Sequence, residues 1–135
     1  MTPQPSTVYV MWRDVEARRF VDAVPADVIL NPAQSGKRFK HPVFEPIGKF
    51  HGWAEYYLTT DGTVAELVYR SELPANKEMC HGAMRLTFSE DGFIQVDWRD
   101  EGGQYKRAPA VALLGIELAA LCAASVLDGT GASEV

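Results

Sequence analysis

Between residues 53 and 100 the chain alternates between apolar and polar residues with a period of two, a pattern typical of antiparallel strands with one buried face. Asp61-Gly62 and Asp91-Gly92 interrupt the alternation. Asp-Gly pairs tolerate the backbone conformations that tight turns require. The pattern therefore predicts a four-strand antiparallel meander over residues 53–100.

The apolar positions also predict how the strands of each hairpin face one another. In the second hairpin Phe88 must lie opposite Ile94 if the apolar side chains of both strands are to share one face. In the first hairpin a two-residue loop at Asp61-Gly62 would pair Tyr57 with Glu66. The apolar face of that hairpin would then carry Ala54, Tyr56, Leu58, Ala65, Leu67 and Tyr69.

Before the meander, the pattern predicts a β-α-β unit. Residues 7–12 are rich in β-branched and aromatic residues and indicate a strand, whereas residues 13–24 have apolar residues at helical spacing. Residues 27–30 indicate a second strand. Residues 31–50 show no period and contain three prolines and two glycines, which predicts an irregular connection. An alternative is a short edge strand at Val43-Phe44 or Ile47.

The last predicted element is a helix over residues 110–126. It follows Pro109, ends near Asp128-Gly129 and is apolar around most of its circumference, with Glu117 in a narrow polar stripe. Such a helix must be largely buried, so we expect it to pack on the sheet or against a second subunit as a homodimer.

The elements together predict an α+β fold. A mostly antiparallel sheet, with a β-α-β unit followed by the four-strand meander, would carry the long C-terminal helix on one face. A chain of 135 residues suits a single domain over residues 1–135. We expect residues 1–6 and 129–135 to be disordered tails.

Composition and charge narrow the possible locations and partners. The chain is 47% hydrophobic and 23% charged, with a net charge of −5, which argues against a general nucleic-acid binder. The N-terminus has neither a basic nor an apolar leader region, so we expect a cytoplasmic protein. We expect no membrane span, because Glu117 interrupts the one long apolar stretch, residues 109–127.

A basic segment provides the main candidate binding site, which comprises Lys37, Arg38, Phe39, Lys40 and His41. Cations interleaved with aromatic side chains are typical of loops that contact phosphate or nucleic acid. The alternative is a solvated connection whose positive charge balances an otherwise acidic chain.

Other chemistry-bearing residues lack the required spacing. His41, His51, His81 and Cys80 form no CxxC, HxxxH or HExxH pattern, so we predict no metal site and no cofactor. No cysteine or histidine has an implied orienting partner, so we predict no catalytic residue.

Three functions are compatible with these features. The first is a small non-enzymatic binding protein that acts through a protein partner, as an adaptor, inhibitor or immunity-type protein. The second is a small-molecule-binding or cone-shaped enzyme fold, with Glu66, Tyr57 or His81 lining a pocket between sheet and helix. The third is phosphate or nucleic-acid contact through residues 37–41.

Overall fold

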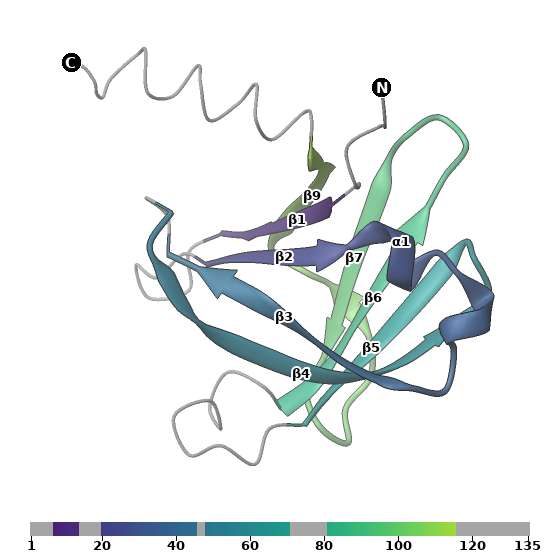
Figure 1. The fold of residues 1–135 in the computed structure, drawn as a ribbon, viewed down its shortest axis with the longest axis horizontal. Helices are drawn as coiled ribbons and strands as arrows, with labels where there is room; N and C mark the ends of the chain where they lie inside the picture. Colours follow the sequence, from purple (N-terminus) through teal and green to yellow (C-terminus); the bar gives the residue numbers. More distant parts are fainter. Residues whose placement is uncertain (1–6, 14–19, 46–47, 71–80, 116–135) are drawn as a thin grey trace.

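The computed structural model describes residues 7–13, 20–45, 48–70 and 81–115, and these residues form one antiparallel sheet with very little helix (Figure 1). The described part of the sheet has nine strands in the order β8-β7-β6-β5-β4-β3-β2-β1-β9. Their bounds are β1 Thr7–Trp12, β2 Val21–Pro25, β3 Arg38–Phe44, β4 Phe50–Thr60, β5 Val64–Arg70, β6 His81–Phe88, β7 Ile94–Arg99, β8 Lys106–Arg107 and β9 Ala110–Leu114. A short helix, α1 (Ala26–Ile29), and a 3-10 turn, η1 (Pro32–Gln34), join β2 to β3.

The sheet curves into a half-barrel because its last strands lie at opposite edges. β8 pairs with β7, whereas β9, a few residues later, pairs with β1. The Ala108 N–H donates to the Val96 carbonyl over 2.9 Å, and the rings of Trp12 in β1 and Trp98 in β7 have centroids 5.6 Å apart. Residues 106–114 thus bring the two edges together. We call the concave side the inner face and the convex side the outer face.

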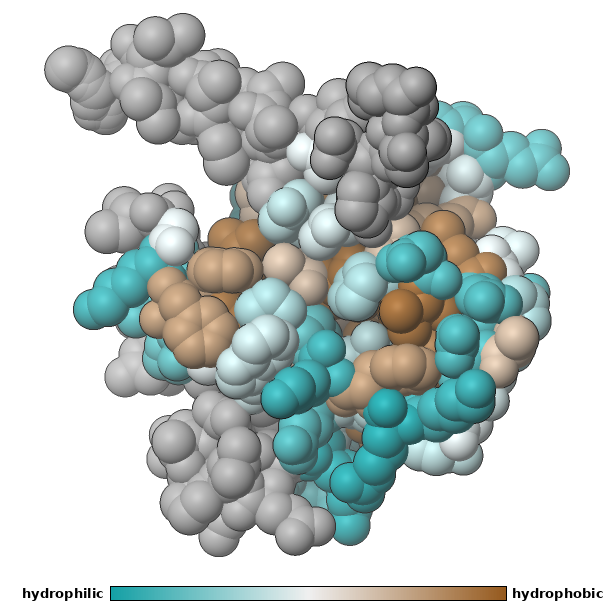
Figure 2. Space-filling view, in the orientation of Figure 1, coloured by the Kyte–Doolittle hydropathy of each residue, from teal (hydrophilic) through white to brown (hydrophobic). Residues whose placement is uncertain are grey.

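The hydrophobic core fills the inner face. Alternate residues of each strand point inward, as the period of two requires. The largest fully buried apolar side chains are Tyr56, Ile29, Leu58, Leu67, Met84, Leu86, Val8, Val10, Val24 and Val43. Each contributes about 1.5–3 kcal/mol by leaving water. In Figure 2 apolar surface lies in the middle of the visible face, above a strip of hydrophilic residues over β3 and β4.

The segment with α1 and η1 closes one end of the half-barrel. The Thr60 hydroxyl at the end of β4 donates to the Ile29 carbonyl in α1 over 2.5 Å, and the Thr60 N–H donates to Ser35 Oγ over 3.0 Å. The buried side chain of Ile29 then fills this end of the inner face. At the other end lie Trp12, Tyr69 and Trp98, close to the ends of β1, β5 and β7.

The predicted α+β class is wrong, and the β-α-β unit accounts for part of the error. Residues 21–24, expected at the end of a helix, lie in β2, whereas residues 27–29 of the strand expected over 27–30 lie in α1. β2 lies between β1 and β3, so its backbone hydrogen bonds come from tertiary pairing that outweighs the local helical spacing. Residues 14–19 of the predicted helix lie outside the described residues.

The predicted C-terminal helix is also corrected. Residues 110–114 form β9, with Ala110 opposite Trp12 and Ala112 opposite Val10. A continuous apolar run fits a buried strand as well as a buried helix. Here residues 110–114 form a strand because they pair with the otherwise free edge of β1. Residues 116–126 of the prediction, and both predicted tails, lie outside the described residues. Among the described residues no helix is long and apolar enough to cross a membrane.

The segment predicted to be irregular, residues 31–50, contains β3. The alternative, a short edge strand at Val43-Phe44, is right that a strand lies here but wrong about its length and position. β3 extends back to Arg38, and it is no edge strand because it is paired on both sides. A shift of register between Val43 and Phe44 places Phe44 opposite Phe50.

The meander is confirmed as β4 to β7, and Phe88 lies opposite Ile94 as predicted. In the first hairpin the predicted apolar face is also confirmed. Its loop is longer than expected, because Thr60 pairs with Ala65, and Tyr57 therefore lies opposite Val68 rather than Glu66. The Asp61 carboxylate accepts the N–H groups of Thr63 and Val64, which stabilises the longer turn.

Candidate functional site

Polar and aromatic side chains from five strands meet on the inner face, at the end opposite α1. They are Trp12, Asp22, His41, Tyr69 and Trp98, and we call them the inner polar cluster. Asp22 belongs to this face because it lies opposite Val10 in β1 and Val43 in β3, whose side chains are both buried there.

His41 is fully buried, and both of its ring nitrogens have partners. Nδ1 lies 3.1 Å from the Pro42 carbonyl oxygen, and Nε2 lies 2.9 Å from the Tyr69 hydroxyl. A carbonyl oxygen can only accept, so Nδ1 must carry the hydrogen. In the neutral ring Nε2 then accepts from the Tyr69 O–H. This assigns the tautomer of His41 and the direction of the Tyr69 hydroxyl.

Asp22 gives the cluster a second ionisable group. Its Oδ2 accepts a hydrogen bond from the Trp12 indole N–H over 2.7 Å. Burial raises the pKa of Asp22, against smaller opposing effects from His41 and from the Trp12 hydrogen bond. A carboxyl in this setting binds a proton more readily than one in water and can present either a donor or an acceptor.

Aromatic rings form a continuous wall beside these groups. The Trp98 ring meets Trp12 edge-on and lies 5.9 Å from the Tyr69 ring at an interplanar angle of 30°. The Trp98 ring extends along β6 from its paired residue, Met84, to Gly82, where the missing side chain leaves room for it. A Cβ atom at Gly82 would come within 2.7 Å of the Trp98 ring.

Tyr56, next to Tyr69 across the sheet, has a buried hydroxyl without a hydrogen-bond partner among the described residues. Burial raises the pKa of this phenol, and the charge of Asp27 adds to the effect. A buried polar atom without a protein partner is normally satisfied by a bound water or a ligand group. The inner face therefore has an unused hydrogen-bonding group next to the cluster.

A pocket of about 240 Å³ adjoins the cluster at Trp98. Trp98 lies in the wall of this pocket and also contacts Trp12 and Tyr69. The pocket is lined by Trp98, Arg99, Asp100, Gly103, Gln104, Lys106, Arg107, Ala108 and Pro109. An indole wall with a few polar groups is the usual composition of a small-molecule site.

The structure divides the predicted basic site between the two faces. In β3 the side chains of Phe39 and His41 point inward, whereas Arg38 and Lys40 are exposed on the outer face. Lys37 precedes the strand, and its Nζ lies 3.4 Å from Gln34 Oε1. His41 is thus separated from the basic residues with which it was grouped. Contact of Lys37, Arg38 and Lys40 with phosphate or nucleic acid stays a prediction.

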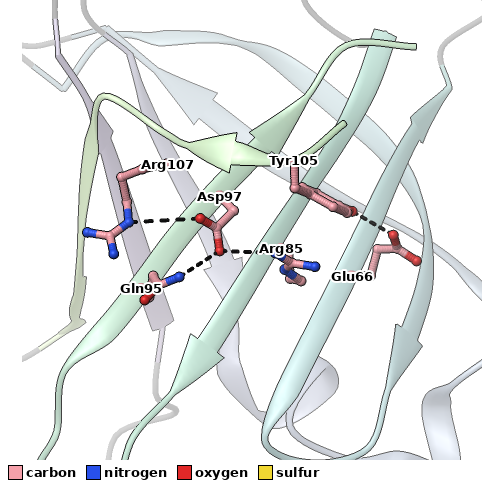
Figure 3. A network of polar contacts seen from close by, with 6 residues as sticks. All are labelled: Glu66, Arg85, Gln95, Asp97, Tyr105 and Arg107. Carbon is pink, nitrogen blue, oxygen red and sulfur yellow. Dashed lines mark hydrogen bonds and ion pairs between the residues drawn. The ribbon is translucent and has the colours of Figure 1, made fainter. Parts of the chain in front are cut away.

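The residues expected to line a pocket lie on the outer face instead. Glu66 accepts a hydrogen bond from the Tyr105 hydroxyl over 2.6 Å (Figure 3). The side chain of His81 is half exposed, and so is Tyr57.

The outer face also carries a charged network around buried Asp97 (Figure 3). Asp97 accepts from Gln95 over 3.0 Å and lies 3.6 Å from Arg85 and 3.9 Å from Arg107. Arg85 in turn lies over the Tyr105 ring, 4.2 Å from its centroid. These contacts hold β8 and the turn before it against β5 to β7.

The sequence prediction missed Trp12, Asp22, Tyr69 and Trp98 as site residues. Three of them could have been placed on the inner face by alternation, because Trp12 continues the series Val8, Val10 and both other aromatics lie on the predicted apolar faces. Asp22 carries no such signal, because the apolar residues around it have helical spacing.

Within the described ranges no three histidine, cysteine or acidic side chains lie together in a way that could hold a metal ion. No protein-family model matches the chain, and comparisons with curated proteins and with solved structures found no match.

We expect the substitution Asp22→Asn to stabilise the protein at pH 7 and to lose this effect in acid. Because the pKa of Asp22 is raised on folding, the folded state binds the proton more tightly, and stability falls as pH rises through the folded-state pKa. Asparagine keeps an acceptor for the Trp12 indole N–H but cannot ionise. Its advantage should therefore vanish as pH approaches the ordinary aspartate value of about 3.9.

Urea unfolding of both proteins between pH 4 and pH 8 measures this difference. The pKa values of Asp61 and Asp91 are lowered, chiefly by hydrogen bonds from the Val64 N–H and the Ser89 hydroxyl. Their stabilising contributions are lost as pH falls, but equally in both proteins, so they cancel in the comparison. An advantage of Asp22→Asn that stayed constant with pH would contradict the assignment.

Proposed function

We propose that the protein binds a small organic molecule at the inner polar cluster and the adjoining pocket. The observation that carries this proposal is the presence of Asp22 and His41, two ionisable side chains from neighbouring strands, on the inner face of the half-barrel. Apolar side chains occupy most of the rest of that face. If this end served only for packing, apolar side chains could fill it equally well.

The energetics favour a role beyond stability. Burying polar groups is costly, and their hydrogen bonds to one another return only about 0.5–1.5 kcal/mol each. The Tyr56 hydroxyl lacks even this compensation within the described part of the chain. Groups that would be inefficient as core packing are suited to orienting a ligand, because ligand sites combine apolar walls with a few fixed polar atoms.

The three tryptophans of the chain provide a direct test. Trp12 and Trp98 belong to the cluster, whereas Trp53 lies on the outer face, where Lys40 stacks on its ring. Each indole N–H gives one cross-peak in a ¹H–¹⁵N spectrum, and single Trp→Phe variants assign them. Titration with a library of neutral, acidic and basic aromatic fragments should shift the Trp12 and Trp98 cross-peaks and leave that of Trp53 in place.

The proposal would be refuted if no fragment class moved the two inner indole signals at millimolar concentration. It would also be refuted if every active fragment moved the Trp53 signal equally, because that would indicate non-specific association.

A protein partner remains the second candidate. Phe50, Trp53 and Tyr57 are large hydrophobic residues of β4 with exposed fractions of 49%, 41% and 44%. Exposed aromatic residues next to a cation such as Lys40 are typical of protein interfaces. A homodimer was predicted through the C-terminal helix. Residues 110–114 form β9 instead of the start of that helix, so they do not support such a dimer.

A further inference from the structure

We infer that the ligand is a small aromatic oxyanion, of the carboxylate type, whose charged group lies beside Lys106. This inference rests on the proposed function and specifies the class of molecule bound. It follows from the charge, the free donors and the size of the pocket beside Trp98.

The charge of the pocket is unusual for this chain. Three cationic residues line it in a chain whose net charge is −5, but strand alternation places only Lys106 on the face of Trp98. Arg99 lies over the Tyr105 ring on the outer face, 5.5 Å from its centroid. Arg107 has a partial counter-charge in Asp97, 3.9 Å away on the outer face. Asp100 accepts a hydrogen bond from the Trp98 indole N–H over 3.2 Å. Asp100 is thus engaged by the indole, and Lys106 is the cation on the face of Trp98 that could hold an anion.

Donors remain available for such an anion. Lys106 makes no hydrogen bond or ion pair with another side chain in the described ranges, and neither does the Gln104 amide. Lys106 lies directly opposite Trp98 in the β7–β8 pairing, which places its side chain on the same side of the sheet as the indole. An ammonium next to an indole face suits a molecule with a charged end and a flat body.

The pocket also limits the body of the ligand. A volume of about 240 Å³ is below the range of roughly 300–1,000 Å³ that holds drug-sized molecules. A single aromatic ring fits, and it can stack on Trp98, which continues into the Trp12 and Tyr69 rings. An organic cation is disfavoured because Lys106 would repel it.

Two probes of equal shape and different charge test this inference. 4-Fluorobenzoate and 4-fluorobenzamide are titrated into the full chain and followed by ¹⁹F line broadening and by the Trp98 indole cross-peak. We expect benzoate to bind at least ten-fold more tightly than the amide, with an affinity that decreases as salt is raised.

The variant Lys106→Gln should weaken benzoate binding about five-fold to ten-fold and leave binding of the amide unchanged. Lys40→Gln is the matched control, because it removes one cation from the outer face, where Lys40 lies over Trp53. Both lysines are exposed, so neither change should affect folding.

The outcomes separate the two proposals. Equal binding of both probes, or an equal effect of the two lysine variants, would overturn the anionic class and leave small-molecule binding intact. If neither these probes nor any library fragment shifts the Trp12 or Trp98 signals, the proposed function itself fails.

Discussion

Replacing Gly82 by alanine should lower the free energy of unfolding by about 3 kcal/mol, because two costs combine. Gly82 has a φ of +124°, a conformation that L-residues adopt only with strain of about 1–3 kcal/mol. An added Cβ would also lie 2.3 Å from the Arg99 carbonyl oxygen and 2.7 Å from the Trp98 ring. Overpacking of this kind typically costs a further 1–3 kcal/mol.

Gly92→Ala separates the two costs. Gly92 also has a positive φ, +91°, but a Cβ there would meet nothing within 4 Å. Its replacement should therefore cost only the backbone term, about 1 kcal/mol. Chemical denaturation of the three proteins gives both values. Equal losses for the two variants would show that the close approach of Trp98 to Gly82 has no energetic importance.

The meander could be predicted from sequence because its signals are local. Asp-Gly turns and strict alternation of apolar residues determine which side chains share a face, and Phe88 lies opposite Ile94 for that reason. In the first hairpin both a two-residue and a four-residue loop give the same apolar face. Alternation therefore predicts the face of Tyr56 and Tyr69 correctly, but the predicted pairing is two residues out of register.

The first third and the last strand could not be predicted in the same way, since their structure depends on distant partners. Residues 21–25 become a strand between β1 and β3, and residues 110–114 become a strand because β1 has a free edge. β3 was obscured by Pro32, Pro42 and Pro46, although the inward residues Phe39, His41 and Val43 stand at every second position from 39 to 43.

The candidate site depends on these same non-local pairings. Asp22 and His41 lie on β2 and β3, which were predicted as a helix and as a loop, so their common face was invisible in the sequence. His41 was selected for its basic neighbours, but the structure places it among Tyr56, Tyr69 and Asp22 instead. Trp12 and Trp98 join the inner polar cluster because the curved sheet brings β1 and β7 together.

Tyr69→Phe should destabilise the protein by about 1–3 kcal/mol, whereas Tyr56→Phe should be neutral or slightly stabilising. The two tyrosines lie opposite each other in β4 and β5, and both are buried on the inner face. The Tyr69 hydroxyl lies 2.9 Å from His41 Nε2, so its removal leaves a buried acceptor unpaired. The Tyr56 hydroxyl has no such partner among the described residues, so its removal relieves a desolvation cost.

Denaturation of both variants and a ¹⁵N spectrum of the imidazole test this contrast. The wild-type spectrum should show the tautomer of His41 with hydrogen on Nδ1, because the Pro42 carbonyl at 3.1 Å can only accept. In Tyr69→Phe the Nε2 signal should move as its hydrogen bond is lost, and in Tyr56→Phe it should stay. Equal destabilisation by both variants, with an unchanged Nε2 signal, would mean that the His41–Tyr69 bond does not organise this end of the half-barrel. The inner polar cluster would then lose the fixed geometry on which ligand orientation depends.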